Sequence, residues 1–268
     1  MGILSCPVCK QELKRENRIY KCANNHCFDI AKEGYVNLNS KNKSGDSTGD
    51  NKEMAVARRD FLNKGYFNVL ANAVLSCANK YSKDGDNVLD ICCGEGYYLH
   101  FLTKALNRRF YGFDLSKNMV RLASKRKSDA TFFVANIANI PLKNNAVDFA
   151  FHLFAPFHAS EFSRVLKNDA YIVTAVAGEN HLYSLKEVLY DTPYKNDENP
   201  PDAGDLILVE KIKVKDTIVL NSKEEISALF QMTPYYYHTP SDGKQKLEKL
   251  DRLKTDVEFV LYVYKKRK

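Results

Sequence analysis

The chain has 268 residues, of which 44% are hydrophobic and 27% are charged, and its formal net charge at pH 7 is +7. This length fits one large α/β domain plus a small module, and the composition excludes a disordered or fibrous protein. We expect a cytoplasmic protein without a membrane span, because the sequence has no run of about 18 apolar residues and no signal-peptide pattern, and the basic surplus modestly favours a polyanionic partner.

Four of the seven cysteines lie within the first 27 residues. A C-x2-C pair and a second cluster twelve residues later predict a zinc site, in which thiolates converge on one tetrahedral ion. Fewer than 40 residues form too small a core to fold without such a cross-link. Cys6, Cys9 and Cys22 supply three ligands, and spacing leaves the fourth open between His26 and Cys27. Four protein ligands make the zinc structural rather than catalytic.

A polar, glycine-bearing segment over residues 41–50 (KNKSGDSTGD) indicates a linker. After it, apolar residues recur at spacings of three and four from residue 52 to about residue 80, which predicts a helical stretch interrupted near Gly65. The predicted organisation is a zinc-binding module over residues 1–38, a linker over residues 39–52 and an α/β domain over residues 53–268.

The hydrophobic period then changes to short apolar runs. Residues 87–91 (NVLDI) predict a strand buried on both faces of a parallel sheet, and a glycine turn and a helical stretch follow it. Further strands are predicted over residues 109–113, 131–135, 146–154 and 171–177, and an antiparallel pair over residues 208–220 and 257–264. Strands that alternate with helices predict a doubly wound, mostly parallel, seven-stranded sheet with its ligand at the carboxyl ends of the strands.

The order strand, glycine turn and helix is a nucleotide-binding arrangement. Asp114 ends the second strand, 24 residues after Asp90, where a carboxylate accepts hydrogen bonds from both ribose hydroxyls of a nucleoside. A dinucleotide site would have a third glycine where Leu99 stands, so a pyrophosphate ligand is disfavoured. The D-x-x-x-G-x-G pattern suits S-adenosylmethionine, which carries an ammonium and a sulfonium but no phosphate. The candidate cofactor residues at these strand ends and in the turn are Asp90, Gly94, Glu95, Gly96, Asp114 and Asn136.

Segments along nearly the whole chain resemble the bacterial 23S rRNA guanine-N1 methyltransferases of the RlmA family, which includes tylosin-resistance methyltransferases. These segments are CPVCK, FDIAKEGYVNL, GDNKEMAVARRDFLNKGYF, VLDICCGEGYY, FDLSK, APF, GENHLYSLK and QMTPYYYHT. The resemblance implies a class I S-adenosylmethionine-dependent methyltransferase that modifies N1 of a guanine in a 23S rRNA hairpin. It also implies that the zinc module helps to recognise RNA and that the protein forms a homodimer. Family branches differ in the guanine that they modify, and this difference governs macrolide resistance.

The resemblance implies individual site residues as well. The zinc ligands would be Cys6, Cys9, Cys22 and His26, with Cys27 as a spare. The S-adenosylmethionine contacts would fall on Phe67, Gly94, Glu95 and His181. Family members often carry Tyr where Phe67 stands and Gly where Cys92 stands. Since cysteine does not adopt positive φ cheaply, either the turn does not need that conformation or the cofactor lies slightly differently.

The sequence identifies no catalytic base. The guanine N1 proton must leave to solvent or to a base, and the carboxylates Asp29 and Glu33 are either candidates or structural. The fourth strand is followed by Phe154-Ala155-Pro156-Phe157, without the carboxamide that exocyclic-amine methyltransferases use, which favours a ring nitrogen as acceptor. Phe154 and Phe157 either stack on a splayed base or pack in the core.

Basic side chains make the zinc module either an RNA surface or a solvated hairpin. They are Lys10, Lys14, Arg15 and Arg18. Two other functions stay open at this point. One is a non-catalytic zinc-bearing RNA-binding protein, and the other is a methyltransferase that acts on tRNA, a protein or a small molecule.

Overall fold

A computed structural model describes residues 2–39 and 52–267, so most of the predicted linker lies outside the described residues. The helices and strands, in chain order, are β1 (Lys14–Glu16), β2 (Ile19–Lys21), β3 (Cys27–Asp29), β4 (Val36–Asn37), α1 (Lys52–Asn63), α2 (Asn68–Tyr81), β5 (Asn87–Ile91), α3 (Tyr97–Thr103), β6 (Arg109–Asp114), α4 (Lys117–Ser124), β7 (Thr131–Val134), β8 (Val147–Leu153), α5 (Ala159–Val165), β9 (Leu166–Ala177), α6 (Tyr183–Leu189), β10 (Ile207–Leu220), α7 (Lys223–Gln231), α8 (Tyr235–His238), α9 (Ser241–Glu248) and β11 (Leu253–Lys265). None of the described helices is long and apolar enough to cross a membrane.

The main sheet has eight strands in the order β10-β11-β9-β8-β5-β6-β7-β4. The run from β9 to β4 is parallel, whereas β11 pairs antiparallel with both β9 and β10. Every residue of β5 is buried, as its unbroken apolar run predicts for a central strand. The seven predicted strands are therefore confirmed, including the late antiparallel pair.

The eighth strand, β4, was not predicted. Val36 pairs with Phe133 and Asn37 with Val134, so the KEGYVNL segment extends the sheet beyond β7. Two residues are too short for any hydrophobic period, which is why the sequence pattern could not reveal this strand. The segment that we assigned to the zinc module thus forms an edge of the main sheet.

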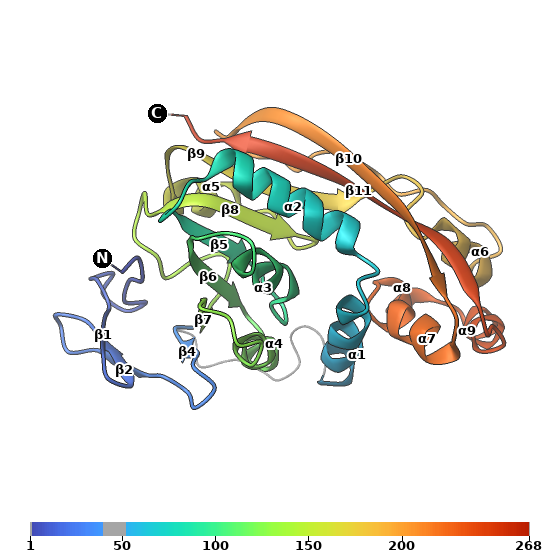
Figure 1. Ribbon diagram of the computed structural model, residues 1–268, viewed down its shortest axis with the longest axis horizontal. Coiled ribbons are helices and arrows are strands. Elements are labelled where there is room, and N and C mark those ends of the chain that lie inside the picture. Colours follow the sequence, from blue (N-terminus) through green and yellow to red (C-terminus); the bar gives the residue numbers. More distant parts are fainter. Residues whose placement is uncertain (1, 40–51, 268) are drawn as a thin grey trace.

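The zinc module packs on the main sheet through backbone and side-chain contacts. Leu4 bridges to Leu142, and the N–H of Ser5 donates to the Pro141 carbonyl over 2.9 Å. Lys143 forms an ion pair with Glu12 at 2.8 Å. In Figure 1 the module lies beside β7 and β4, at the end of the sheet opposite β10. The buried hydrophobic side chains of the module, except Tyr35, belong to the same hydrophobic cluster as one face of the sheet.

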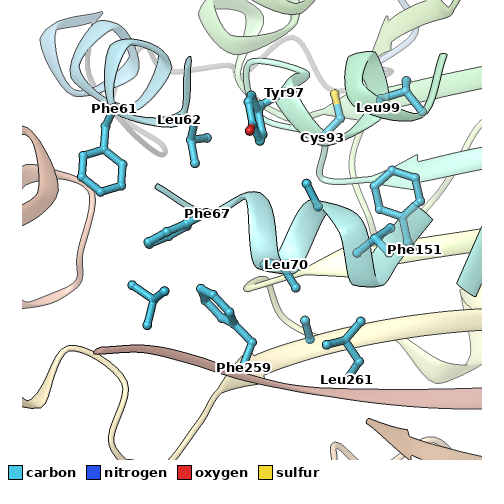
Figure 2. Packing of buried hydrophobic residues seen from close by; sticks show 14 of the residues in the cluster. Phe61, Leu62, Phe67, Leu70, Cys93, Tyr97, Leu99, Phe151, Phe259 and Leu261 are labelled. Carbon is cyan, nitrogen blue, oxygen red and sulfur yellow. The ribbon is translucent and has the colours of Figure 1, made fainter. Parts of the chain in front are cut away.

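The break between α1 and α2 positions an aromatic ring in the other core cluster. Gly65 has a φ of +81°, a left-handed conformation that ends α1 and that suits glycine. The chain then places Phe67 directly before α2, where its ring lies between α1 and β11. Figure 2 shows Phe67 between Leu62 and Phe259, and its ring centroid is 5.1 Å from that of Phe259. This aromatic layer lies near the carboxyl ends of the parallel strands.

Candidate active site and zinc centre

The four predicted zinc ligands lie together in the N-terminal module. The Sγ atoms of Cys6, Cys9 and Cys22 and a ring nitrogen of His26 all lie within 4.8 Å of one another. Individual distances are 3.6 Å between the Cys9 and Cys22 sulfurs and 3.4 Å from the Cys22 sulfur to His26 Nδ1. Tetrahedral zinc with Zn–S bonds of about 2.3 Å separates its ligand atoms by about 3.5 to 3.8 Å. The donor set and its spacing therefore fit a structural zinc ion.

The fourth donor atom of this cluster comes from His26 rather than Cys27. The Cys27 side chain is exposed, and its Sγ lies 3.4 Å from the Asn25 carbonyl oxygen instead of facing the other sulfurs. Cys27 begins β3, where side chains alternate between the two faces of the hairpin, and this alternation turns it away from the cluster. Of the two alternatives that sequence spacing left open, the geometry favours His26.

The turn after β5 is built from left-handed residues. Gly94 and Gly96 have φ values of +53° and +81°, and Cys92 has φ 58° although it carries a β-carbon. The turn does need positive φ at Cys92, which answers the question that the sequence raised. Backbone hydrogen bonds fix it, because Cys93 N–H donates to the Phe113 carbonyl and Gly96 N–H to the Cys93 carbonyl.

Space is available next to one glycine of the turn. A β-carbon added at Gly94 would meet nothing within 4 Å, whereas one added at Gly96 would lie 2.8 Å from the Ala123 β-carbon. Gly96 therefore serves the packing of α3 against α4, and Gly94 leaves the backbone open to a ligand.

Three carboxylates surround this turn. The two oxygens of Asp114 accept hydrogen bonds from the N–H groups of Gly94 at 3.0 Å and Ser116 at 2.8 Å. Asp90 is buried, and its Oδ2 has no hydrogen-bond partner among the described residues. Burial, reinforced by the neighbouring Asp114 and Glu95 carboxylates, raises the pKa of Asp90 well above its usual value. A cationic ligand would relieve this crowding of negative charge.

Glu95 forms an ion pair with Arg126, which follows the end of α4. Arg126 Nε donates to Glu95 Oε2 over 2.6 Å and to the Glu95 carbonyl over 2.9 Å. Burial raises the pKa of the Glu95 carboxyl, and the Arg126 charge opposes this shift. The other carboxylate oxygen, Oε1, has no partner among the described residues. Glu95 is thus fixed in place with one acceptor unused.

A crevice and a larger cavity adjoin each other beside the turn. The crevice, about 50 Å³, is lined by Asp90, Gly94 and Glu95 among others, and has room for only a few water molecules. The cavity, about 500 Å³, is lined by side chains from α1, α3, α8 and the segments that follow β8 and β9. Four residues line both spaces: Arg58, Leu62, Tyr98 and Phe154. Side chains of α1 and Phe154 therefore separate the crevice from the cavity.

Phe67 and His181, which the family resemblance implied, meet in the wall of the larger cavity. Their ring centroids are 5.9 Å apart, and both rings contact Phe259. Burial lowers the pKa of His181 to about 4, so the ring is neutral at pH 7. Its Nδ1 accepts a hydrogen bond from the Glu258 N–H over 3.1 Å, which assigns the proton to Nε2. His181 therefore presents an N–H donor.

Three other candidates lie away from these spaces. Asn136 follows β7, and its Oδ1 accepts the Ala138 N–H over 2.9 Å. Glu33 forms an ion pair with Arg121 of α4 at 2.8 Å, and this contact lowers the pKa of Glu33. Asp29 ends β3 on an exposed face. None of these three is among the described residues that line the crevice or the cavity.

Sequence reasoning missed much of the cavity wall. Tyr194, Asn196 and Tyr237 line the cavity but come from segments without a local ligand-binding pattern. The family resemblance did single out the segment QMTPYYYHT, which contains Tyr237, without giving it a role. Of the two phenylalanines after β8, Phe157 packs against His152 and Phe162, and only Phe154 lines the cavity.

Comparison with known proteins agrees with this arrangement. The family model of the RlmA N-terminal zinc ribbon matches residues 4–42, and a methyltransferase-domain model matches residues 88–173. The chain is 30% identical over 190 residues to the 23S rRNA (guanine(748)-N(1))-methyltransferase of Streptomyces fradiae, covering 69% of this chain and 67% of that protein. It is 26% identical over 265 residues to Bacillus subtilis YxjB, named as a 23S rRNA (guanine-N(1)-)-methyltransferase, covering 93% and 92% of the two chains.

Two solved structures share the fold at low sequence identity. The YcgJ protein from Bacillus subtilis superposes with a TM-score of 0.51 at 15% identity, over 74% of this chain and 98% of that one. A chain from the complex of the Haloferax volcanii Trm112 methyltransferase activator with a methyltransferase gives a TM-score of 0.52 at 18% identity, over 82% and 100%.

Proposed function

Because the chain belongs to the RlmA family of 23S rRNA (guanine-N1-)-methyltransferases, we propose that it transfers a methyl group from S-adenosylmethionine to N1 of a guanine in a 23S rRNA hairpin. The observation that carries the proposal is the group of carboxylates around an open glycine turn. Asp90, Glu95 and Asp114 surround Gly94, and an aromatic-lined cavity adjoins them.

The residues of the turn fit S-adenosylmethionine. Asp114 ends β6 with its carboxylate beside Gly94, and carboxylate oxygens at this place can accept hydrogen bonds from ribose hydroxyls. Among the residues that the structure describes, Asp90 and Glu95 each have a carboxylate oxygen without a hydrogen-bond partner, which a cationic ligand could use. Phe67 and His181 would contact the cofactor from the cavity side, the latter through its Nε2–H. Since the crevice is narrow, binding requires the side chains of Arg58 and Leu62 to shift.

The bound cofactor supplies a methyl group that its sulfonium already activates. The chain itself has to hold the guanine so that N1 faces that methyl group, and such alignment is where most of the acceleration arises. The proton on N1 must leave to solvent or to a base. We assign no step to Asp29 or Glu33, since Glu33 instead joins the zinc module to α4.

The zinc module supports RNA recognition in this proposal. Lys14, Arg15 and Arg18 are exposed on or beside its β1–β2 hairpin and can neutralise phosphates. The assignment of residues 1–38 to this module and of residues 53–268 to the methyltransferase domain is part of the proposal, with β4 as the strand that connects them. We also propose that the protein acts in the cytoplasm, where its rRNA substrate is made, and as a homodimer.

The direct test incubates the purified chain with S-adenosylmethionine and 23S rRNA fragments and locates the methyl group by mass spectrometry. One N1-methylguanine in a hairpin is expected, and the same nucleotide should lose its methyl group in rRNA from cells that lack the gene. Asp114→Ala serves as the control, because it should abolish both methylation and cofactor binding in calorimetry. Methylation of a different atom, or of no RNA, would contradict the proposal.

A further inference from the structure

Three exposed aromatic side chains line the larger cavity. Among the large hydrophobic side chains that the described residues leave exposed, the aromatic ones are Phe154, Tyr194 and Tyr237, with exposed fractions of 48%, 51% and 64%. All three line the cavity beside the glycine turn. Exposed apolar surface that gathers in one place marks a binding site, because it is unfavourable in water. The cavity is therefore shaped for a flat, apolar-faced ligand group.

The backbone of Phe154 is strained. It follows β8 directly and has φ 58°, a left-handed conformation that is an outlier for a bulky residue. Its N–H donates to the Ala175 carbonyl over 3.4 Å. A glycine would make the same turn without strain. The phenyl ring is therefore present at a position where the backbone conformation disfavours phenylalanine. Such outliers concentrate at functional sites.

The Phe154 ring lies at the boundary between the crevice and the cavity, since it lines both. Its centroid is 5.7 Å from that of Phe259, with an angle of 54° between the rings. Phe259 is fully buried and packs against Phe67, as Figure 2 shows. Phe154 thus rests on a fixed aromatic base, and a flat group stacked on it would lie next to the proposed methyl-donor site.

The two tyrosines are also held in position. Lys186 is fully buried, and its Nζ lies 4.2 Å from the Tyr194 ring centroid and donates to the Tyr194 carbonyl over 2.9 Å. The hydroxyl of Tyr237 lies 3.0 Å from Met54 Sδ. Aromatic surfaces that are ordered before binding lose little conformational freedom when a base stacks on them.

We propose that Phe154 is the stacking platform for the target guanine, which flips out of the hairpin into the cavity, and that Tyr194 and Tyr237 stack on flanking unpaired nucleotides. Looped RNA is recognised by such stacking of splayed bases on aromatic side chains. This inference rests on the proposed function and adds the residues that hold the substrate base.

The test compares RNA turnover with cofactor binding in variants of the full chain. Phe154→Ala should lower kcat/KM for the 23S rRNA hairpin about 10- to 100-fold, as expected for one lost base–aromatic stack, and should change the S-adenosylmethionine Kd less than about threefold. Phe154→Tyr and Phe154→Trp keep a flat ring and should retain most of the activity. The proposal is overturned if Phe154→Ala retains full RNA turnover, or if its loss of turnover is matched by its loss of cofactor affinity.

A second pair of variants separates stacking from folding. Phe154→Gly removes both the ring and the left-handed strain, so its Tm should exceed that of Phe154→Ala by about 2 to 4 °C, while the two should be equally impaired on RNA. Phe157→Ala is the matched control, because this ring packs against Phe162 instead of lining the cavity. It should lower Tm and leave RNA turnover largely intact at temperatures below Tm. Recovery of RNA turnover in Phe154→Gly would refute a role for the ring.

Failure of the platform and failure of the proposed function give different results. If the wild-type chain methylates another atom of a guanine instead of N1, the proposed function fails, and the platform stands provided that Phe154→Ala still loses turnover. Methylation of a different base overturns both the proposed function and the guanine platform. If the wild-type chain methylates no RNA, the proposed function fails, and the platform is tested by comparing the Kd of the hairpin for the wild type and for Phe154→Ala. An equal Kd for wild type and Phe154→Ala would then overturn the platform, and a raised Kd for the variant would support it.

Discussion

Cys92 carries backbone strain in the glycine turn. Its φ of 58° is left-handed, a conformation that costs a residue with a β-carbon roughly 1 kcal/mol more than glycine. Cys92→Gly should therefore raise the free energy of unfolding by at most about 0.5 kcal/mol, because glycine loses more conformational entropy on folding than cysteine and this loss offsets much of the relieved strain. Urea denaturation with a fixed m-value measures this difference.

The adjacent Cys93 is the matched control for this prediction. Its side chain is buried to 7% exposure, and it is not among the described residues with positive φ. Cys93→Gly should lower the free energy of unfolding, since it removes buried surface and relieves no strain. Equal destabilisation by the two substitutions would mean that packing of the thiol, not backbone conformation, dominates at Cys92.

The two glycines in the turn from β5 to α3 have different roles: Gly96 allows close packing against α4, and Gly94 leaves space for a ligand. Gly96→Ala should lower the free energy of unfolding by about 2 to 4 kcal/mol, because the new methyl group would lie 2.8 Å from the Ala123 β-carbon in α4. Gly94→Ala meets no neighbouring atom within 4 Å and should cost only the strain of about 1 to 2 kcal/mol.

For cofactor binding, Gly94→Ala should be the more damaging of the two substitutions, although it is the less damaging one for stability. The methyl group of Gly94→Ala fills the space where we propose S-adenosylmethionine, so its Kd should rise at least about tenfold in calorimetry. Gly96→Ala should bind more nearly like the wild type at a temperature where it stays folded. Normal affinity in Gly94→Ala would place the cofactor elsewhere.

The zinc module depends on its metal, since its short strands bury little apolar surface of their own. His26→Ala and Cys22→Ser should each reduce the zinc content from one ion per chain towards zero, as measured by atomic absorption. They should also expose the module to proteolysis. Cys27→Ser should keep one zinc ion, because the Cys27 side chain points away from the cluster. Loss of zinc from Cys27→Ser, with retention in His26→Ala, would reverse the assignment of the fourth ligand.

At the scale of the whole molecule, the parts that were predictable are those with local signals. The buried run of β5, the C-x2-C pair and the glycine turn each identify themselves within a few residues. Asp90 and Asp114 could be predicted as site residues, because the carboxyl ends of parallel strands meet at one edge of the sheet. In contrast, β4 consists of two residues and owes its existence to the edge of β7.

The cavity wall could not be predicted for a related reason. Met54, Tyr194 and Tyr237 come from three distant segments that meet only after the helices have packed. Each residue alone is an ordinary methionine or tyrosine, and no spacing links them. The left-handed backbone of Phe154 is likewise invisible in sequence, because phenylalanine does not favour it.

The net charge of +7 predicts RNA binding that weakens steeply with salt, because each phosphate contact releases bound counterions. Lys14 and Arg15 are exposed, and neither forms an ion pair within the part of the chain that the structure describes. Lys14→Ala and Arg15→Ala should each reduce the slope of log Kobs against log salt by about 0.7 to 0.9, and weaken binding to all RNA sequences alike. Lys83→Ala is the control, because this exposed lysine lies in the loop before β5, a central strand of the sheet, and not in the zinc hairpin. Unchanged slopes in the first two variants would remove the zinc hairpin from the RNA interface, and a changed slope for Lys83→Ala would place the loop before β5 in that interface.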